Sequence, residues 1–103
     1  MKTRKDDQTL YLIPETDLVA SRISALRDYF LDELEATDAG HIVLDVHGVD
    51  IVDSLGVNLI VGLYRQATAE SRTIEIVGAG DKFMKVANFF RLPAIFSIRG
   101  QET

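Results

Sequence analysis

The stretch DIVDSLGVNLIVGLY, residues 50–64, joins an extended apolar run to an apolar run with helical spacing. The periodicity changes at Asp53, and from there the pattern predicts a helix through Ala69. Asp53 is suited to cap this helix, because a short side-chain oxygen can accept backbone N–H groups that the first turn leaves unpaired. Ser54 follows, so the sequence puts a hydroxyl in the first turn of a helix without a candidate catalytic base beside it.

Strands and helices alternate on both sides of this stretch. Short β-branched runs predict strands, and apolar residues at spacings of three and four predict helices. The expected strands are residues 9–13, 41–46, 73–77 and, less regularly, 94–98, and the expected helices are residues 15–36, 53–69 and 81–90. This order favours an α/β fold with largely parallel strand pairing.

Several local features refine that outline. The nearly continuous apolar run HIVLDV, residues 41–46, predicts a central strand that is covered on both faces. Thr16 or Asp17 is expected to cap the first helix and Asp81 the third. In the third helix, Phe89 is an expected exposed contact, and the predicted core residues are Phe83, Met84, Val86, Ala87 and Phe90.

Length and composition limit the function classes. A chain of 103 residues with 47% hydrophobic residues suits one domain spanning residues 1–103. The net charge of −5 argues against nucleic acid as a partner. The chain has no cysteine, which excludes disulfides and thiolate chemistry and fits a reducing cytoplasm. The polar N-terminus is not typical of a secretory signal, and no segment approaches the roughly 20 apolar residues that insertion across a membrane requires.

The position of Ser54 has two interpretations. In one, it is an ordinary first-turn serine, and Asp53 does no more than cap the helix. In the other, which is what a resemblance to a known family implies, Ser54 is a phosphorylation site. The N-terminal end of a helix tolerates a phosphate. The added charge of about −1.5 to −2 beside Asp50 and Asp53 would then disturb a docked partner more than the domain itself. Gly56, which has no side chain, would leave the approach to the hydroxyl open.

Helical spacing extends this site along one stripe. The stripe that starts at Ser54 is expected to be exposed and to bind a partner, and its members are Asn58, Val61, Gly62 and Arg65. Leu55 is expected to point into the core, whereas Leu59, Ile60, Leu63 and Ala67 lie toward the opposite side. Arg65 is eleven residues from Ser54, about 16 Å along a helix, and so is too far away to neutralise a phosphate there.

Other candidate sites are weaker. His41 and His47 lie too far apart along an extended chain to share a metal, and both are expected to be solvated; no metal or cofactor is predicted. Asp45 is expected to accept backbone N–H groups from the connection at residues 48–53. The loop GAGDKF, residues 78–83, follows a strand and opens a helix, but the third glycine of the dinucleotide-binding motif is absent, so a plain turn is expected.

The whole pattern resembles a known family. The segment LDVHGVDIVDSLGV, residues 44–57, is similar to the signature of STAS domains, the module found in sulfate transporter tails and bacterial anti-sigma factor antagonists. The positions that match are Asp45, Gly48, Asp53, Ser54 and Gly56. The resemblance implies a sheet of roughly four strands, mostly parallel or mixed, with helices packed against it. It also implies docking onto a partner protein, and that Ser54 corresponds to the serine phosphorylated in the antagonists.

The expected function is therefore a non-enzymatic switch in the bacterial cytoplasm. The resemblance implies that the chain binds an anti-sigma factor with ATP-dependent serine kinase activity, that phosphorylation of Ser54 releases it, and that a serine phosphatase resets it. The expected partner-binding residues are Asp53, Ser54, Gly56, Asn58, Val61 and Arg65. The alternative is a STAS subunit of a transporter or multiprotein scaffold with Ser54 unmodified. An enzyme is disfavoured because no nucleophile with a matched base can be named.

Overall fold

The computed structural model describes residues 1–100 and contains one five-stranded sheet with the order β1-β2-β3-β4-β5. The strands are β1 Lys2–Asp6, β2 Thr9–Ile13, β3 His41–Asp45, β4 Thr73–Ala79 and β5 Ser97–Gly100. The α-helices are α1 Ile23–Glu35, α2 Ser54–Ala69 and α3 Asp81–Phe89, and the short 3₁₀ helices are η1 Ala20–Arg22 and η2 Leu92–Ala94. The expected C-terminal end of the domain, residue 103, lies outside the described residues.

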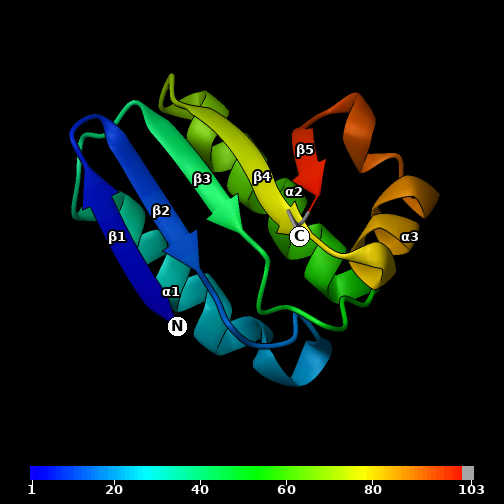
Figure 1. Ribbon diagram of the computed structural model, residues 1–103. Helices are drawn as coiled ribbons and strands as arrows, with labels where there is room; N and C mark the ends of the chain where they lie inside the picture. The colour runs from blue at the N-terminus through cyan, green and yellow to red at the C-terminus, as the bar shows by residue number, and fades with distance from the viewer. Residues whose placement is uncertain (101–103) are drawn as a thin grey trace.

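The strand order places the helices on one side of the sheet. Strands β2 to β5 are parallel and follow one another across the sheet in sequence order. Crossover connections between parallel strands are right-handed almost without exception, so crossovers that all advance in one direction put their helices on the same face. Figure 1 shows α1 and α2 behind the sheet and α3 beyond β4 on the β5 side. Within residues 1–100, the face toward the viewer therefore carries no helix.

This arrangement contradicts the expectation that residues 41–46 are covered on both faces. The alternating exposure of β2 shows which side is the core side, since Leu10 and Leu12 are buried while the residues between and beside them are half-buried. In β3, Ile42 and Leu44 face the helices with no exposed surface. The intervening Val43 lines a hollow on the uncovered face, where it is nevertheless only 5% exposed. A nearly continuous apolar run was therefore compatible with a sheet that is covered on one side only.

The first strand was missed by the sequence analysis. Residues Lys2–Asp6 pair antiparallel with Thr9–Ile13 across a tight turn, in which Asp7 adopts a left-handed conformation (φ 52°). All five residues of β1 are exposed, so the strand lacks the apolar alternation that marks a half-buried strand. Charged side chains are typical of edge strands, which must avoid pairing with other chains. The guanidinium of Arg4 lies 4.1 Å from the centre of the Tyr11 ring and covers part of β2.

The remaining elements follow the predicted order with shifted ends. The helix expected from residue 15 begins only at Ile23, after η1, and the strand expected to end at Val77 continues to Ala79. The helix expected from Asp53 begins one residue later, with Asp53 as its cap. After α3, Arg91 takes the left-handed conformation (φ 59°) that ends the helix. Within residues 1–100, no helix has the length and apolar character needed to cross a membrane.

Candidate functional site

Ser54 is the first residue of α2, and it is exposed. Asp53 caps the helix: its Oδ1 accepts the N–H of Gly56 at 2.9 Å, and its Oδ2 accepts the N–H of Ala20 at 2.9 Å. These backbone hydrogen bonds, the one from Gly56 first, hold the pKa of the Asp53 carboxyl below its usual value. The capping expected of Asp53 is confirmed, and its carboxylate also joins α2 to the start of η1.

A short backbone ladder fixes the chain just before Ser54. The N–H of Leu18 donates to the carbonyl of Ile51 at 2.9 Å, and the N–H of Asp53 donates to the carbonyl of Leu18 at 3.1 Å. Leu18 and Val52 thus form an isolated parallel bridge. The start of α2 is therefore held by the loop that follows β2, through bonds that leave the Ser54 side chain on the outside.

Asp17 contributes to the same contact, and the expectation that it caps the first helix is wrong. Its Oδ1 accepts the N–H groups of Asp50 at 3.2 Å and Ile51 at 3.0 Å, so it fastens the loop before α2. The N-cap residue of α1 is Arg22, and its side chain makes no capping hydrogen bond. A sequence signal for this role was weak, because an aspartate in a polar loop suits a helix start and a loop contact equally well.

Gly56 does not serve the role expected for it. The residue is buried, and a Cβ added there would lie 2.0 Å from the carbonyl oxygen of Leu18 and 2.8 Å from Val52. The missing side chain therefore lets α2 pack against the Leu18 backbone of its own domain. It does not open a path for a partner toward Ser54. Two apolar residues close to Ser54 in the sequence are exposed instead: Ile51 is 51% exposed and Leu55 is 48% exposed.

The stripe along α2 is only partly as expected. Asn58, Gly62 and Arg65 are exposed, whereas Val61 is half-buried and packs against the core. The expectation that Leu55 points into the core is wrong. The residues expected on the opposite side, Ile60, Leu63 and Ala67, are buried as predicted, and Leu59 is half-buried. The exposed surface next to Ser54 thus includes Leu55 and is more apolar than the sequence suggested.

The uncovered face of the sheet holds a second group of polar residues. A hollow of about 760 Å³ lies over β2, β3, β4 and β5, and His41 and Glu75 are among the residues that line it. The His41 Nε2 lies 2.9 Å from Glu75 Oε2, its Nδ1 lies 2.6 Å from Thr73 Oγ1, and Arg99 pairs with Glu75. His41 is therefore part of a cross-strand network rather than simply solvated.

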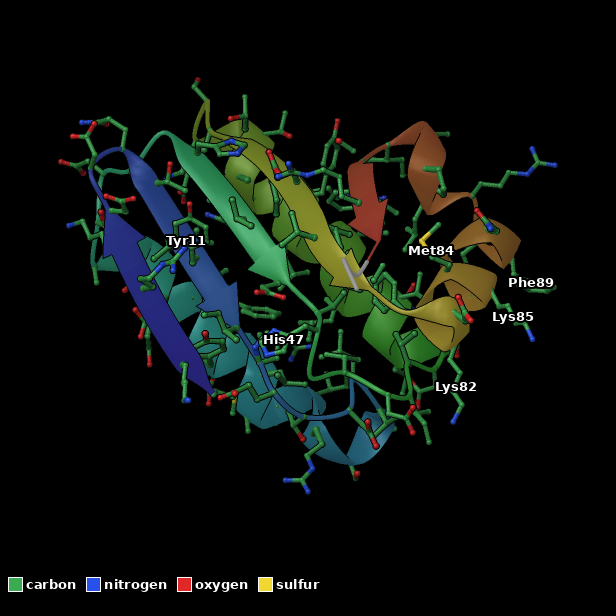
Figure 2. All side chains as sticks on the ribbon, viewed as in Figure 1. Tyr11, His47, Lys82, Met84, Lys85 and Phe89 are labelled. Carbon is green, nitrogen blue, oxygen red and sulfur yellow. The ribbon has the colours of Figure 1, made fainter. Side chains whose placement is uncertain are left out.

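Asp45 and His47 form a pair at the carboxyl end of β3. The Asp45 Oδ1 accepts the backbone N–H of His47 at 3.0 Å and lies 2.8 Å from the His47 Nδ1. Asp45 is thus an acceptor, as expected, but its backbone donor is His47, just before the predicted 48–53 connection. A Cβ on Gly78 would come within 2.6 Å of Asp45 Oδ1, and Gly78 itself has φ 76°. Figure 2 shows His47 and Tyr11 on the uncovered side of the sheet. Within residues 1–100, no three acidic, histidine or cysteine side chains gather as metal ligands.

The loop GAGDKF is a strand-to-helix connection. Gly78 and Ala79 still belong to β4, and Gly80 is the N-cap of α3 without a side-chain hydrogen bond, so the expectation that Asp81 caps α3 is wrong. Phe83 and Ala87 are buried, as predicted. Phe90 was expected in the core but is 41% exposed, and Phe89 is 80% exposed. Figure 2 shows Phe89 and Lys85 on the outer side of α3.

Comparisons with known proteins place this geometry in context. The family model described as "Mlab, STAS domain" matches residues 1–96. No curated protein matches the sequence. TM1081 from Thermotoga maritima, a candidate anti-sigma factor antagonist, has a similar structure with a TM-score of 0.88 at 19% identity, covering 97% of this chain and 86% of that one.

Two further structures show the range of proteins with this fold. SpoIIAA, an anti-sigma factor antagonist in its unphosphorylated form, has a TM-score of 0.77 at 16% identity over 94% of this chain and 85% of its own. The phosphorylated form of SpoIIAA, from Bacillus, gives 0.69 at 16% identity over 94% and 88%. A sulfate transporter family protein from Wolinella succinogenes gives 0.71 at 12% identity over 91% and 78%. At these identities the likeness establishes a common fold.

Proposed function

The chain belongs to the STAS domain family, and from that premise we propose that it is a protein–protein interaction switch of the anti-sigma factor antagonist type. It binds an anti-sigma factor with ATP-dependent serine kinase activity, and phosphorylation of Ser54 releases the complex. The observation that carries this proposal is the exposed hydroxyl of Ser54 at the first position of α2. The kinase would use ATP to phosphorylate Ser54, and a serine phosphatase would remove the phosphate and reset the switch. Both would act in the cytoplasm.

The surroundings of Ser54 suit a docking surface. Hydrogen bonds from Gly56 and Ala20 to Asp53 hold the helix start in one geometry, so a partner would meet a preformed surface. Ile51, three residues before Ser54, and Leu55, directly after it, are exposed and offer apolar area that the domain itself does not bury. The proposed partner-binding residues are Asp53, Ser54, Asn58, Val61 and Arg65, with Ile51 and Leu55 added.

A phosphate on Ser54 would act mainly on the partner. The Asp53 carboxylate already accepts the N–H of Gly56, so that donor is not available to a phosphate. The nearby Asp50 carboxylate is paired with Lys82 at 3.3 Å. The phosphate would therefore add about −1.5 to −2 of charge beside an existing carboxylate. An exposed group with this charge remains hydrated in the free domain, whereas burial without a cation in an interface is costly.

The neighbours with the same fold support this proposal at the level of the family. SpoIIAA is known as an anti-sigma factor antagonist and has structures in both its phosphorylated and unphosphorylated forms, each with the fold of this chain. The fold thus accommodates a phosphate in that protein. By this proposal the present chain is the substrate of a kinase and has no catalytic role of its own.

A second candidate function belongs to another class. The sulfate transporter family protein and a component of the stressosome, a signal integration hub, also have this fold, with TM-scores of 0.71 and 0.73. The chain would then be a structural subunit of a transporter or scaffold, and Ser54 would remain unmodified. The 80% exposed Phe89 lies on α3 rather than at the Ser54 surface and favours a contact of this kind.

Phosphorylation by a candidate anti-sigma factor kinase separates the two functions. We expect the purified chain, incubated with the kinase and ATP, to gain one phosphate at Ser54, detected by intact mass and peptide mapping. The Ser54→Ala variant should bind the kinase and resist release. The Ser54→Asp variant should keep the circular dichroism spectrum of the parent chain but bind at least about tenfold more weakly.

Two outcomes would contradict the switch. The first is an unmodified Ser54 in the presence of a kinase that phosphorylates another substrate. The second is binding of Ser54→Asp with undiminished affinity, which would show that charge at this position does not control association. If the Ser54→Asp chain unfolds, the idea that the helix start tolerates charge is wrong.

A further inference from the structure

Helix α2 contains two glycines, and the fold explains only one of them. Glycine inside a helix costs about 1 kcal/mol relative to alanine, so its presence calls for a reason. At Gly56 the reason is the Leu18 carbonyl oxygen, 2.0 Å from where a Cβ would be. At Gly62 an added Cβ would meet no atom within 4 Å. Nothing in residues 1–100 therefore requires a glycine at position 62.

The space above Gly62 is part of a groove between α1 and α2. The groove has a volume of about 390 Å³ and is lined by side chains of residues 23–34 on α1 and 55–66 on α2. Sites for small molecules have volumes of about 300–1,000 Å³, so the groove is at the small end of that range. A protein helix, with a diameter of about 10–12 Å, would fill the same volume in less than one turn. The size thus favours a small molecule over a docked helix.

The base and the mouth of the groove are apolar. Phe30, Leu34 and Leu63 are buried and line the groove, and Leu31 and Leu55 remain 40% and 48% exposed at its edges. Covering such side chains removes apolar surface from water, at roughly 25 cal/mol per Å². The lining therefore suits an aliphatic chain.

The polar side chains of the groove indicate the head group. Arg27 is the ionised residue that lines it, together with the amides of Asn58 and Gln66. Among residues 1–100, Arg27 has no carboxylate within salt-bridge distance. The other residues that line the groove carry no charge, so Arg27 is the cation nearest to a ligand bound there. A guanidinium binds a carboxylate through two parallel hydrogen bonds.

We propose that the α1–α2 groove binds a free alkyl carboxylate of medium chain length. The alkyl chain lies over Gly62 between Leu31 and Leu55, and the carboxylate pairs with Arg27. Gly62 is then required because a side chain there would occupy the volume of the ligand. This proposal goes beyond the proposed function and does not depend on phosphorylation of Ser54.

Titration with decanoate, below the concentration at which it forms micelles, tests the proposal by amide chemical shifts in NMR spectra. We expect saturable shifts that cluster along residues 23–34 and 55–66, and none with acetate, which has the head group without the chain. The Gly62→Leu variant should bind decanoate at least about tenfold more weakly. Its thermal midpoint should be no lower than that of the parent chain, because leucine favours a helix over glycine.

Two further variants complete the test. Arg27→Gln should weaken decanoate binding by about threefold or more, because it removes the charge and keeps a polar side chain. Gly40→Leu is the matched control, since Gly40 also has no atom within 4 Å of an added Cβ but does not line the groove; its affinity should be unchanged.

Any of four results would overturn the proposal: no saturable shift, shifts that map elsewhere, unchanged affinity in Gly62→Leu, or unchanged affinity in Arg27→Gln. Shifts of the groove residues that depend on protein concentration without ligand would also overturn it, because they would assign the groove to a second copy of the chain.

Discussion

Ser54 and Asp53 are adjacent, but the Asp53 side chain makes structural hydrogen bonds whereas the Ser54 side chain is exposed. The Asp53 side chain turns inward and accepts two backbone N–H groups from different segments, Gly56 in its own helix and Ala20 in η1. The Ser54 side chain lies on the exposed side of the same helix start. Because the capping is done by Asp53, the hydroxyl of Ser54 is free of a structural role in the cap. By our proposal, a serine placed in this way is modified without loss of the helix start.

Asp53 predicts a specific response to acid. The hydrogen bonds hold its pKa below the ordinary value of 3.8 in the folded chain, so the unfolded chain takes up the proton first as the pH falls. The contribution of Asp53 to stability is therefore complete above 3.8 and is lost as the pH falls below 3.8 toward the folded-state pKa. We expect urea unfolding to show a stability gap between the parent chain and Asp53→Asn that is constant from about pH 7 to 5 and narrows at about pH 3. A gap of constant size over the whole range would contradict this role.

Helix α2 faces three environments. Val57, Ile60, Leu63 and Ala67 face the core, Gly56 contacts the Leu18 backbone, and Gly62 faces an open groove. The helix runs for 16 residues with a cap at its start, and its apolar face is wider than the core alone requires because Leu55 and Leu59 border the groove. The helix is therefore both a structural element and the side of two proposed sites, one at its start and one along its middle.

The two glycines of α2 predict opposite effects of the same substitution. Gly56→Ala should destabilise the fold by about 3 kcal/mol, because the Cβ meets the Leu18 backbone and the backbone cannot easily move aside. Gly62→Ala should stabilise it by about 1 kcal/mol, because the Cβ meets no atom and alanine favours the helix. Free energies of unfolding from urea titrations measure both, and each variant is the control for the other. Equal effects at the two positions would show that helix propensity, not packing, governs both.

The part of the molecule that the structure describes is one sheet with α1 and α2 behind it and α3 beyond β4 on the β5 side. The cause is the strand order, since every parallel crossover advances in the same direction. The helix-facing side of the sheet is apolar and fully buried, as for Leu12, Ile42 and Ile76. The other side carries the cross-strand network of His41, Glu75 and Arg99. The two faces of each strand therefore have different tolerance for polar residues.

Two neighbouring residues of β4 test this difference between the two faces of the sheet. Ile76 has no exposed surface on the helix side, and Val77 is half-buried and lines the hollow on the uncovered side. Ile76→Thr should cost at least about 2 kcal/mol, because it buries a hydroxyl and removes packed methyl groups. Val77→Thr should cost about 1 kcal/mol or less, because its hydroxyl can reach water. The free energies of unfolding of the two variants, from thermal or urea unfolding, are compared. An equal loss of stability in Val77→Thr and Ile76→Thr would contradict the view that the Val77 side of the sheet is open to water.

The order of the elements, the α/β fold and the start of α2 could all be predicted from the sequence alone. Those features depend on local chemistry: apolar period, β-branched runs and an aspartate that can cap a helix. The local pattern alone predicted two strands and one helix, at residues 9–13, 73–77 and 53–69. The STAS-like fold inferred from residues 44–57 is confirmed by the five-stranded sheet and by the family match.

What each side of these elements contacts could not be predicted from the sequence, because it depends on the folded arrangement. The charged strand β1 has no apolar alternation and exists because it pairs with β2. Gly56 meets a backbone oxygen from a loop 38 residues earlier in the chain, and Asp17 binds N–H groups that lie 33 and 34 residues later. Leu55, expected inside, lies outside because the groove between α1 and α2 ends beside it. A local pattern can place a side chain on a helix, but its environment depends on segments that are distant in sequence and that only folding brings together.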